Sequence, residues 1–302
     1  MLWIPFTFAA AFFQNMRSAI QRHLKSELTD LGAASVRFLY ALPFALIWLA
    51  ALTWVGSFSL PSIHSEFLLW VLGGSVSQII FTVLLMWLFS LSNFTVGTAL
   101  SKTEVVQVIL LEALLLQTDL SLEGLIAIVI AFAGVIIMTI GKSQKSIGSV
   151  VAGLGHKTTM IGLLCGLTLG LSSVLFRGAA LSLDEGGLLM RAAFTLAIAT
   201  TIQSLILWVL LTVRQPGQIR KTLGHWRVCS LVGFAGWAAS ICWFMAFTLT
   251  QAAYVRALGQ VELIFTFIAS VFIFKEKIKA AEMAGVLLLI GAIVFLILER
   301  AV

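Results

Sequence analysis

Three ionisable side chains lie within one apolar stretch of the sequence, residues 97–116. This stretch, GTALSKTEVVQVILLEALLL, is hydrophobic enough to cross a bilayer but contains Lys102, Glu104 and Glu112. A charge at the bilayer centre costs about 2.5–3.5 kcal/mol on insertion scales, so such residues face other protein groups or a water-filled space. Glu104 and Glu112 share one broad face of a helix, because they are eight residues apart. The pattern indicates a polar site inside a membrane helix.

A second polar group lies in residues 254–262, late in the chain. Arg256 and Gln260 are four residues apart and share a helix face, with Tyr254 before them and Glu262 after them. Carboxylate and guanidinium groups inside a membrane bind polar or zwitterionic solutes, and a carboxylate in a dry site can exchange a proton. The alternative is that these charges only pair with one another and hold helices together.

The two groups predict one substrate-binding site that distant parts of the chain share. Gln14 in the first apolar run and Trp237 in the eighth are expected to contribute to it. The predicted substrate-binding residues are Lys102, Glu104, Tyr254, Arg256, Gln260, Glu262, Gln14 and Trp237.

Three further arginines in apolar runs are open to two interpretations. Arg37 and Arg191 either contact the solute or reach lipid headgroups, since each is near the start of its run. Arg177 lies inside a run, with Asp184 and Glu185 as acidic neighbours along the chain.

The composition identifies the environment of these segments. The chain has 302 residues, 60% hydrophobic and 11% charged, whereas a soluble domain is about 45–50% apolar and roughly 25% charged. This balance predicts a polytopic membrane protein with lipid as a partner, and the net charge of +6 does not indicate nucleic acid. The cysteines lack metal or redox spacing, and neither a P-loop nor an HExxH motif occurs. We therefore expect no cofactor, no metal and no enzymatic activity.

Ten apolar runs are long enough to cross the hydrocarbon, which requires about 20 residues of helix. They cover residues 2–22, 32–55, 66–89, 94–116, 121–140, 158–181, 187–213, 225–248, 251–274 and 280–299. The longest connection, 141–157, is rich in Gly, Ser and Lys, as is typical of a linker. The predicted organisation is one five-helix unit over 1–140, this linker, and a second five-helix unit over 158–302.

The two units carry signs of an internal duplication. A shift of 154 positions superimposes Asp30, Gly32 and Arg37 on Asp184, Gly186 and Arg191, and a shift of 158 superimposes Ala99, Leu100 and Glu104 on Ala257, Leu258 and Glu262. Tandem copies with an odd number of spans must have opposite orientations. The expected fold class is an all-α polytopic membrane protein with ten transmembrane helices arranged as two inverted five-helix repeats.

Basic residues predict the orientation of the chain. Thirteen Lys and Arg residues lie in or beside the loops 23–31, 141–157, 214–227 and 275–279, whereas the opposite face has Arg300 and little else. The positive-inside rule places these loops in the cytoplasm and both termini outside the cell (inner) membrane.

Three glycines recur every four residues in the sixth run: Gly162, Gly166 and Gly170. Small residues at this spacing let helix backbones approach closely. The stripe predicts close packing within the monomer or, as the alternative, a homodimer contact.

The chain resembles a known transporter family over nearly its whole length. The segment FIFKEKIKAAEMAGVLLLIGAIVFLI, 272–297, has Glu276 at the start of a short loop, then Gly285, Val286 and Gly291 in the last run. With ten spans in two inverted units, this pattern resembles the EamA-type transporters of the drug/metabolite transporter superfamily. The resemblance implies the inverted-repeat fold and a central cavity lined by the fourth and ninth spans, among others.

The expected function is secondary transport, by alternating access, of small polar metabolites such as amino-acid-like or other zwitterionic or charged solutes. Proton-driven multidrug relatives use a Glu in the first helix, where this sequence has Gln14 and Asn15. The coupling partner is thus open between a proton and a counter-solute. The alternatives are export of organic cations or drugs, a passive channel and, with least support, an intramembrane enzyme.

Overall fold

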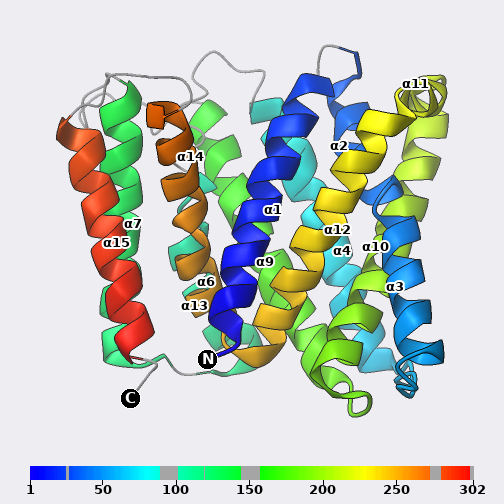
Figure 1. Cartoon of the computed structure of the whole chain (residues 1–302), viewed down its shortest axis with the longest axis horizontal. Coiled ribbons are helices and arrows are strands. Elements are labelled where there is room, and N and C mark those ends of the chain that lie inside the picture. The colour runs from blue at the N-terminus through cyan, green and yellow to red at the C-terminus, as the bar shows by residue number, and fades with distance from the viewer. Residues whose placement is uncertain (25–26, 89–100, 119, 144–156, 273–279, 300–302) are drawn as a thin grey trace.

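Helices make up all the regular secondary structure in the described part of this protein (Figure 1). The structure is a computed structural model and describes residues 1–24, 27–88, 101–118, 120–143, 157–272 and 280–299. A helix satisfies its backbone N–H and C=O groups within its own segment, which is why helices can span membranes. The all-α class predicted from the sequence is confirmed for these ranges.

The helices follow the predicted apolar runs closely. They are α1 (Trp3–Leu24), α2 (Asp30–Leu39), α3 (Leu42–Trp54), α4 (Ser65–Leu88), α6 (Glu104–Leu116), α7 (Leu122–Ser143), α9 (Lys157–Ser182), α10 (Gly187–Arg214), α11 (Gln218–Gly224), α12 (Trp226–Leu249), α13 (Ala252–Gly259), α14 (Val261–Phe272) and α15 (Ala280–Glu299). The runs predicted at 32–55 and 251–274 are each divided into two helices, and α11 occupies a connection where the sequence predicts no helix. Residues 94–100 of the fourth predicted run lie outside the described residues.

Six helical segments of the described chain are long and apolar enough to cross a membrane. They are Asp30–Trp54, Ser65–Leu88, Met160–Ser182, Gly187–Arg214, Trp226–Leu249 and Ala280–Leu298. α7 has a shorter apolar stretch, Leu122–Ile137, and α1 is long enough but carries the polar residues Gln14, Asn15 and Arg17. The chain is a multi-pass membrane protein.

A proline explains why the second run is divided. Pro43 lies in the first turn of α3 and has no backbone N–H. In a continuous helix its ring would clash with the carbonyl group of Leu39, four residues earlier. α2 accordingly ends at Leu39, and α3 begins at Leu42.

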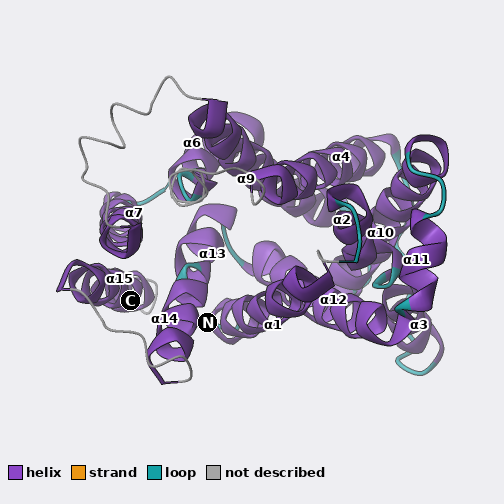
Figure 2. Ribbon diagram, turned by 90° about the horizontal axis from the view of Figure 1, so that it is seen from above, coloured by secondary structure: helices purple, strands orange, loops and turns teal. Residues whose placement is uncertain are grey.

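Three long helix pairs organise the bundle. α1 packs along α12, α4 along α9, and α7 along α15. Figure 2 shows α7 and α15 side by side at one edge, while α10 lies towards the other edge and packs against α2, α3, α4 and α12. α6 and α13 carry residues of the two predicted polar groups and contact each other between these pairs. The start of α1 and the end of α15 lie at the same end of the bundle (Figure 1).

A substitution at Gly134 in α7 tests how closely α7 packs on α15. A methyl group there would lie 2.9 Å from the carbonyl oxygen of Gly285 and 2.9 Å from the backbone nitrogen of Leu289. Because backbone atoms cannot move aside cheaply, we expect Gly134→Ala to lower the melting temperature of the purified protein by several degrees. Gly291→Ala is the control, since a methyl group at Gly291 meets nothing within 4 Å and alanine favours the helix. Equal melting temperatures for the two variants would contradict this packing.

Candidate functional site

The two predicted polar groups meet where membrane helices are interrupted. α13 and α14 are separated by Gln260, which interrupts the ninth predicted span. α6 begins at Glu104, directly after the turn residues Lys102 and Thr103. Irregular backbone at membrane depth is tolerated only where protein or a water-filled space surrounds it. Both interruptions therefore belong to the interior of the bundle.

Glu104 is bound by two residues of the α13 segment. Its carboxylate accepts a hydrogen bond of 2.6 Å from Nη2 of Arg256, with which it forms an ion pair, and one of 3.3 Å from Nε2 of Gln260. The side chains of Arg256 and Glu104 are 5% and 2% exposed, so solvent does not screen the pair. Removing either charge would leave the other buried without compensation. The pair joins α6 to α13.

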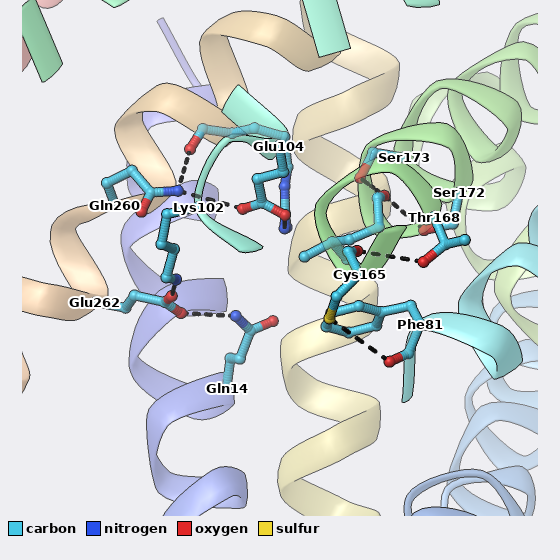
Figure 3. Close-up of polar contacts among 12 residues, drawn as sticks. Gln14, Phe81, Lys102, Glu104, Cys165, Thr168, Ser172, Ser173, Gln260 and Glu262 are labelled. Atoms are coloured by element: carbon cyan, nitrogen blue, oxygen red, sulfur yellow. Dashed lines mark hydrogen bonds and ion pairs between the residues drawn. The ribbon is translucent and has the colours of Figure 1, made fainter. Parts of the chain in front are cut away.

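The carboxylate of Glu262 binds a second set of side chains (Figure 3). Lys102 forms an ion pair with its carboxylate, and Nε2 of Gln14 in α1 donates a hydrogen bond of 2.7 Å to it. Gln14 also accepts a hydrogen bond of 3.1 Å from the indole Nε1 of Trp243 in α12. The guanidinium group of Arg256 lies over the same indole ring, 5.0 Å from its centroid. Trp243 thus connects the two sets.

The residues connected in this way are named the central network: Gln14, Lys102, Glu104, Trp243, Arg256, Gln260 and Glu262. Its two ion pairs differ in access. The side chains of Lys102 and Glu262 are 21% and 17% exposed, several times more than those of Arg256 and Glu104. The accessible pair can exchange its partners for charged groups of a solute, whereas the shielded pair is suited to hold the helices in place.

The central network has polar capacity that its own members do not use. Nε of Arg256 and Oε1 of Gln260 make no hydrogen bond to any described group. Within the described ranges, no three His, Cys, Asp or Glu side chains lie close enough together to hold a metal ion. The chemistry that this arrangement supports is the binding of a polar solute.

Six of the eight predicted site residues belong to the central network, and two lie elsewhere. The hydroxyl group of Tyr254 is 2.9 Å from that of Ser121, at the start of α7. Trp237 packs in an aromatic cluster of α3 and α12 whose other members are Phe44, Trp48 and Phe234.

Trp243 is a network member that the sequence patterns do not select. The sequence feature that could have identified it is its position deep inside an apolar run. Tryptophans of the aromatic belt lie at the membrane interface, so the belt does not account for Trp243. A buried indole N–H requires an acceptor, and here Gln14 supplies it.

The glycine stripe of α9 positions the start of α6. A methyl group at Gly166 would lie 2.8 Å from the carbonyl oxygen of Ser101, and one at Gly170 would lie 2.9 Å from Cγ2 of Val108. The expected packing within the monomer is confirmed for these two glycines. It allows α6, and with it Glu104, to lie close against α9.

Glu112 lies outside the central network and stabilises the connection between α12 and α13. Its carboxylate oxygens accept hydrogen bonds of 2.8 and 2.9 Å from the backbone N–H groups of Ala252 and Ala253, at the start of α13. The positive end of the helix dipole favours a carboxylate there. Nε of Arg177 lies 3.0 Å from the same carboxylate, and its Nη1 donates to carbonyl oxygens at the end of α12. The Glu112–Arg177 pair therefore holds both helix ends.

The structure gives partners for two of the other arginines. Arg177 pairs with Glu112 rather than with its acidic neighbours along the chain, Asp184 and Glu185. Nη2 of Arg191 donates a hydrogen bond of 2.8 Å to the backbone carbonyl oxygen of Asp184, at the end of the membrane helix.

One family model and a set of solved structures match this chain. The model of the EamA-like transporter family matches residues 157–298. A solved structure described as "Crystal structure of protein" has the same fold over 98% of this chain and 96% of its own, with a TM-score of 0.70 and 12% sequence identity. In all, 28 solved chains match, and no curated protein does. At this identity the likeness to solved structures establishes the fold alone.

Glu112→Gln tests the connection between α12 and α13. The amide would leave Arg177 without its buried counter-charge, so we expect a loss of about 3–5 kcal/mol in the free energy of unfolding. Thermal melting of the purified protein in detergent measures it. Glu123→Gln, which neutralises an exposed carboxylate in the first turn of α7, is the control and should melt like the wild type. A Glu112→Gln protein as stable as this control would refute the assignment.

Proposed function

We propose that this chain, whose residues 157–298 form an EamA-like transporter family domain, is a secondary transporter that moves small polar metabolites across the cytoplasmic membrane by alternating access. The observation that carries the proposal is the central network, in which the accessible Lys102–Glu262 pair lies at the interruptions of two membrane helices. Transporters bind substrates at such interruptions, near the midplane where two structural repeats meet.

Helix packing supports ten spans in two inverted five-helix units, residues 1–140 and 158–302. In this arrangement α1 corresponds to α9, α2 with α3 to α10, α4 to α12, α6 to α13 with α14, and α7 to α15. Each main contact then has its counterpart: α1 packs on α12 as α9 packs on α4, α1 contacts α13 and α14 as α9 contacts α6, and α7 and α15 contact each other. Such paired contacts are expected for tandem copies of opposite orientation.

The central network obeys the same correspondence. A shift of 158 positions relates Lys102 to Gln260 and Glu104 to Glu262. Exchanging the members of these pairs converts the Lys102–Glu262 contact into the Gln260–Glu104 contact, and both contacts are present. The helix interruptions at Lys102 and Gln260 correspond in the same way. We therefore place the substrate site where the two units meet.

An amino-acid-like or other zwitterionic solute suits this network chemically. Its carboxylate would replace Glu262 as the partner of Lys102, and its ammonium group would replace Lys102 as the partner of Glu262. The exchange costs little at a partly exposed pair, while the shielded Glu104–Arg256 pair remains in place. An organic cation, the competing substrate class, would use Glu262 but leave Lys102 without a partner.

The orientation that we propose places the basic loops in the cytoplasm. The short helix α11, which carries Arg220 and Lys221, lies at the end of the bundle opposite the start of α1 (Figure 1). The positive-inside rule then leaves the start of α1 outside. A proton or a counter-solute would drive transport.

Solute counterflow in proteoliposomes tests the proposal. Liposomes containing the purified protein are loaded with one unlabelled solute, and uptake of the labelled solute is measured for neutral amino acids, acidic amino acids, organic cations and sugar phosphates. We expect saturable counterflow for at least one class. Lys102→Gln and Glu262→Gln should lower it by about tenfold or more, because each removes one charged contact to the solute.

The controls remove the same charges from exposed positions. Lys221→Gln and Glu185→Gln should keep the wild-type flux. Flux that rises linearly with concentration, without stimulation by solute on the far side, would identify a channel and overturn the proposal. Wild-type counterflow in Lys102→Gln and Glu262→Gln would move the site away from the central network.

A further inference from the structure

Two arginines inside the bundle form no ion pair with any carboxylate of the described residues. Arg17 lies seven residues before the end of α1, and Arg37 lies seven residues after the start of α2, so both are about 10 Å along their helices from the same end of the bundle. They flank Gly236 of α12: a methyl group there would lie 3.3 Å from Cδ of Arg17 and 3.4 Å from the carbonyl oxygen of Arg37. The side chain of Arg17 and the backbone of Arg37 therefore lie close together beside α12.

The hydrogen bonds of these arginines are to neutral groups. Nη1 of Arg17 donates to Oε1 of Gln21, and Nη1 of Arg37 donates to Oγ1 of Thr82, each at 3.4 Å. Gln21 is 3% exposed and Thr82 is 2% exposed. The Arg17 contact is buried and the Arg37 contact is partly buried, so both guanidinium groups bind protein groups instead of lipid headgroups, the usual partners of an arginine near a helix end.

No carboxylate of the described interior is available to neutralise them. Each interior carboxylate already has a cationic partner: Glu104 has Arg256, Glu262 has Lys102, and Glu112 has Arg177. Glu262 is the carboxylate whose charge acts on Arg17. Arg37 is influenced by two further positive charges, those of Arg17 and Arg256. The region between the central network and the basic-loop end of the bundle is therefore cationic.

Uncompensated cations are costly in a protein interior, and the other interior arginines, Arg177 and Arg256, are paired with carboxylates. We propose that Arg17 and Arg37 form a subsite for an oxyanion, the carboxylate or phosphate group of a net-anionic organic solute. The inference rests on the proposed transport function and specifies its substrate class. Each guanidinium presents five N–H donors in a planar fork that matches a carboxylate or phosphate.

The proposed subsite lies between the central network and the basic loops. Gln14 precedes Arg17 by three residues on α1, which puts the two side chains on one face about one turn apart. Gln14 binds Glu262 of the accessible Lys102–Glu262 pair, so the proposed subsite lies about one turn of α1 from a residue of the central network. The same two cations repel organic cations, so they disfavour that competing substrate class.

Paired ligands that differ in one anionic group test the subsite. Melting of the purified protein in detergent is followed with glutamate against glutamine and with glycerol 3-phosphate against glycerol. We expect the anionic member of at least one pair to raise the melting temperature while its neutral analogue does not. Which pair responds distinguishes a carboxylate from a phosphate. No difference within either pair would overturn the inference.

Variants locate the effect. Arg17→Gln and Arg37→Gln should each raise the dissociation constant of the stabilising anion by about tenfold or more. Arg191→Gln, which removes an arginine bound to the Asp184 carbonyl oxygen at a helix end, should leave it unchanged. Arg17→Lys and Arg37→Lys keep the charge but lose the fork, and weaker anion binding in these variants supports the subsite if the Gln variants do not fold. Anion binding that survives every folded variant would place the anion elsewhere.

Two further arms separate this inference from its alternatives. Stabilisation by phosphatidylglycerol, lost in Arg17→Gln, together with no effect of either soluble anion, would mean a lipid headgroup site and overturn a solute site. Counterflow of neutral or cationic solutes that is unchanged in Arg17→Gln would refute the subsite and leave the transport function intact. Anion binding without counterflow of any solute would refute the transport function instead.

Discussion

A charge inside a membrane-embedded bundle needs an opposite charge or several hydrogen bonds, and this requirement organises the interior of the protein. Glu104 and Arg256 compensate each other across α6 and α13 at 2.6 Å, shielded from solvent. Glu112 and Arg177 compensate each other where α12 turns into α13. Both pairs fix α13 relative to its neighbours. The accessible Lys102–Glu262 pair can then change partners without loss of the frame around it.

The interruption at Gln260 allows α13 and α14 to contribute to one network. Residues two or six apart on a continuous helix point in clearly different directions, so a continuous helix would turn Glu262 away from Arg256 and Gln260. With the helix divided there, Gln260 binds Glu104 while Glu262 binds Lys102 and Gln14. The division leaves Oε1 of Gln260 without a described partner. The broken helix thus provides both the geometry and the unused polar atoms of the binding site that we propose.

Helix positions and most charged site residues could be predicted from the sequence, because apolar runs and the charges within them are visible without a structure. Pro43 also indicates from the sequence that the second run is divided into two helices. No comparable residue indicates the interruption of the ninth run at Gln260. The partners could not be predicted, since they depend on packing between segments far apart, as with Glu112 and Arg177. The sequence predicts Tyr254 as a site residue because it is two residues from Arg256. The helix turns its hydroxyl group towards Ser121 instead.

The two units that we propose have matching helix contacts but differ in their interior charges. Arg37 coincides with Arg191 after a shift of 154 positions, yet α10 begins only at Gly187, so Arg191 is four residues inside its helix where Arg37 is seven. Gly186 and Gly187 have φ values of 89° and 66°, left-handed conformations that delay the start of the helix. The position equivalent to Arg17 is Leu171. An anionic solute would therefore meet buried Arg17 and partly buried Arg37 on the basic-loop side and no such pair at the equivalent positions of the second unit.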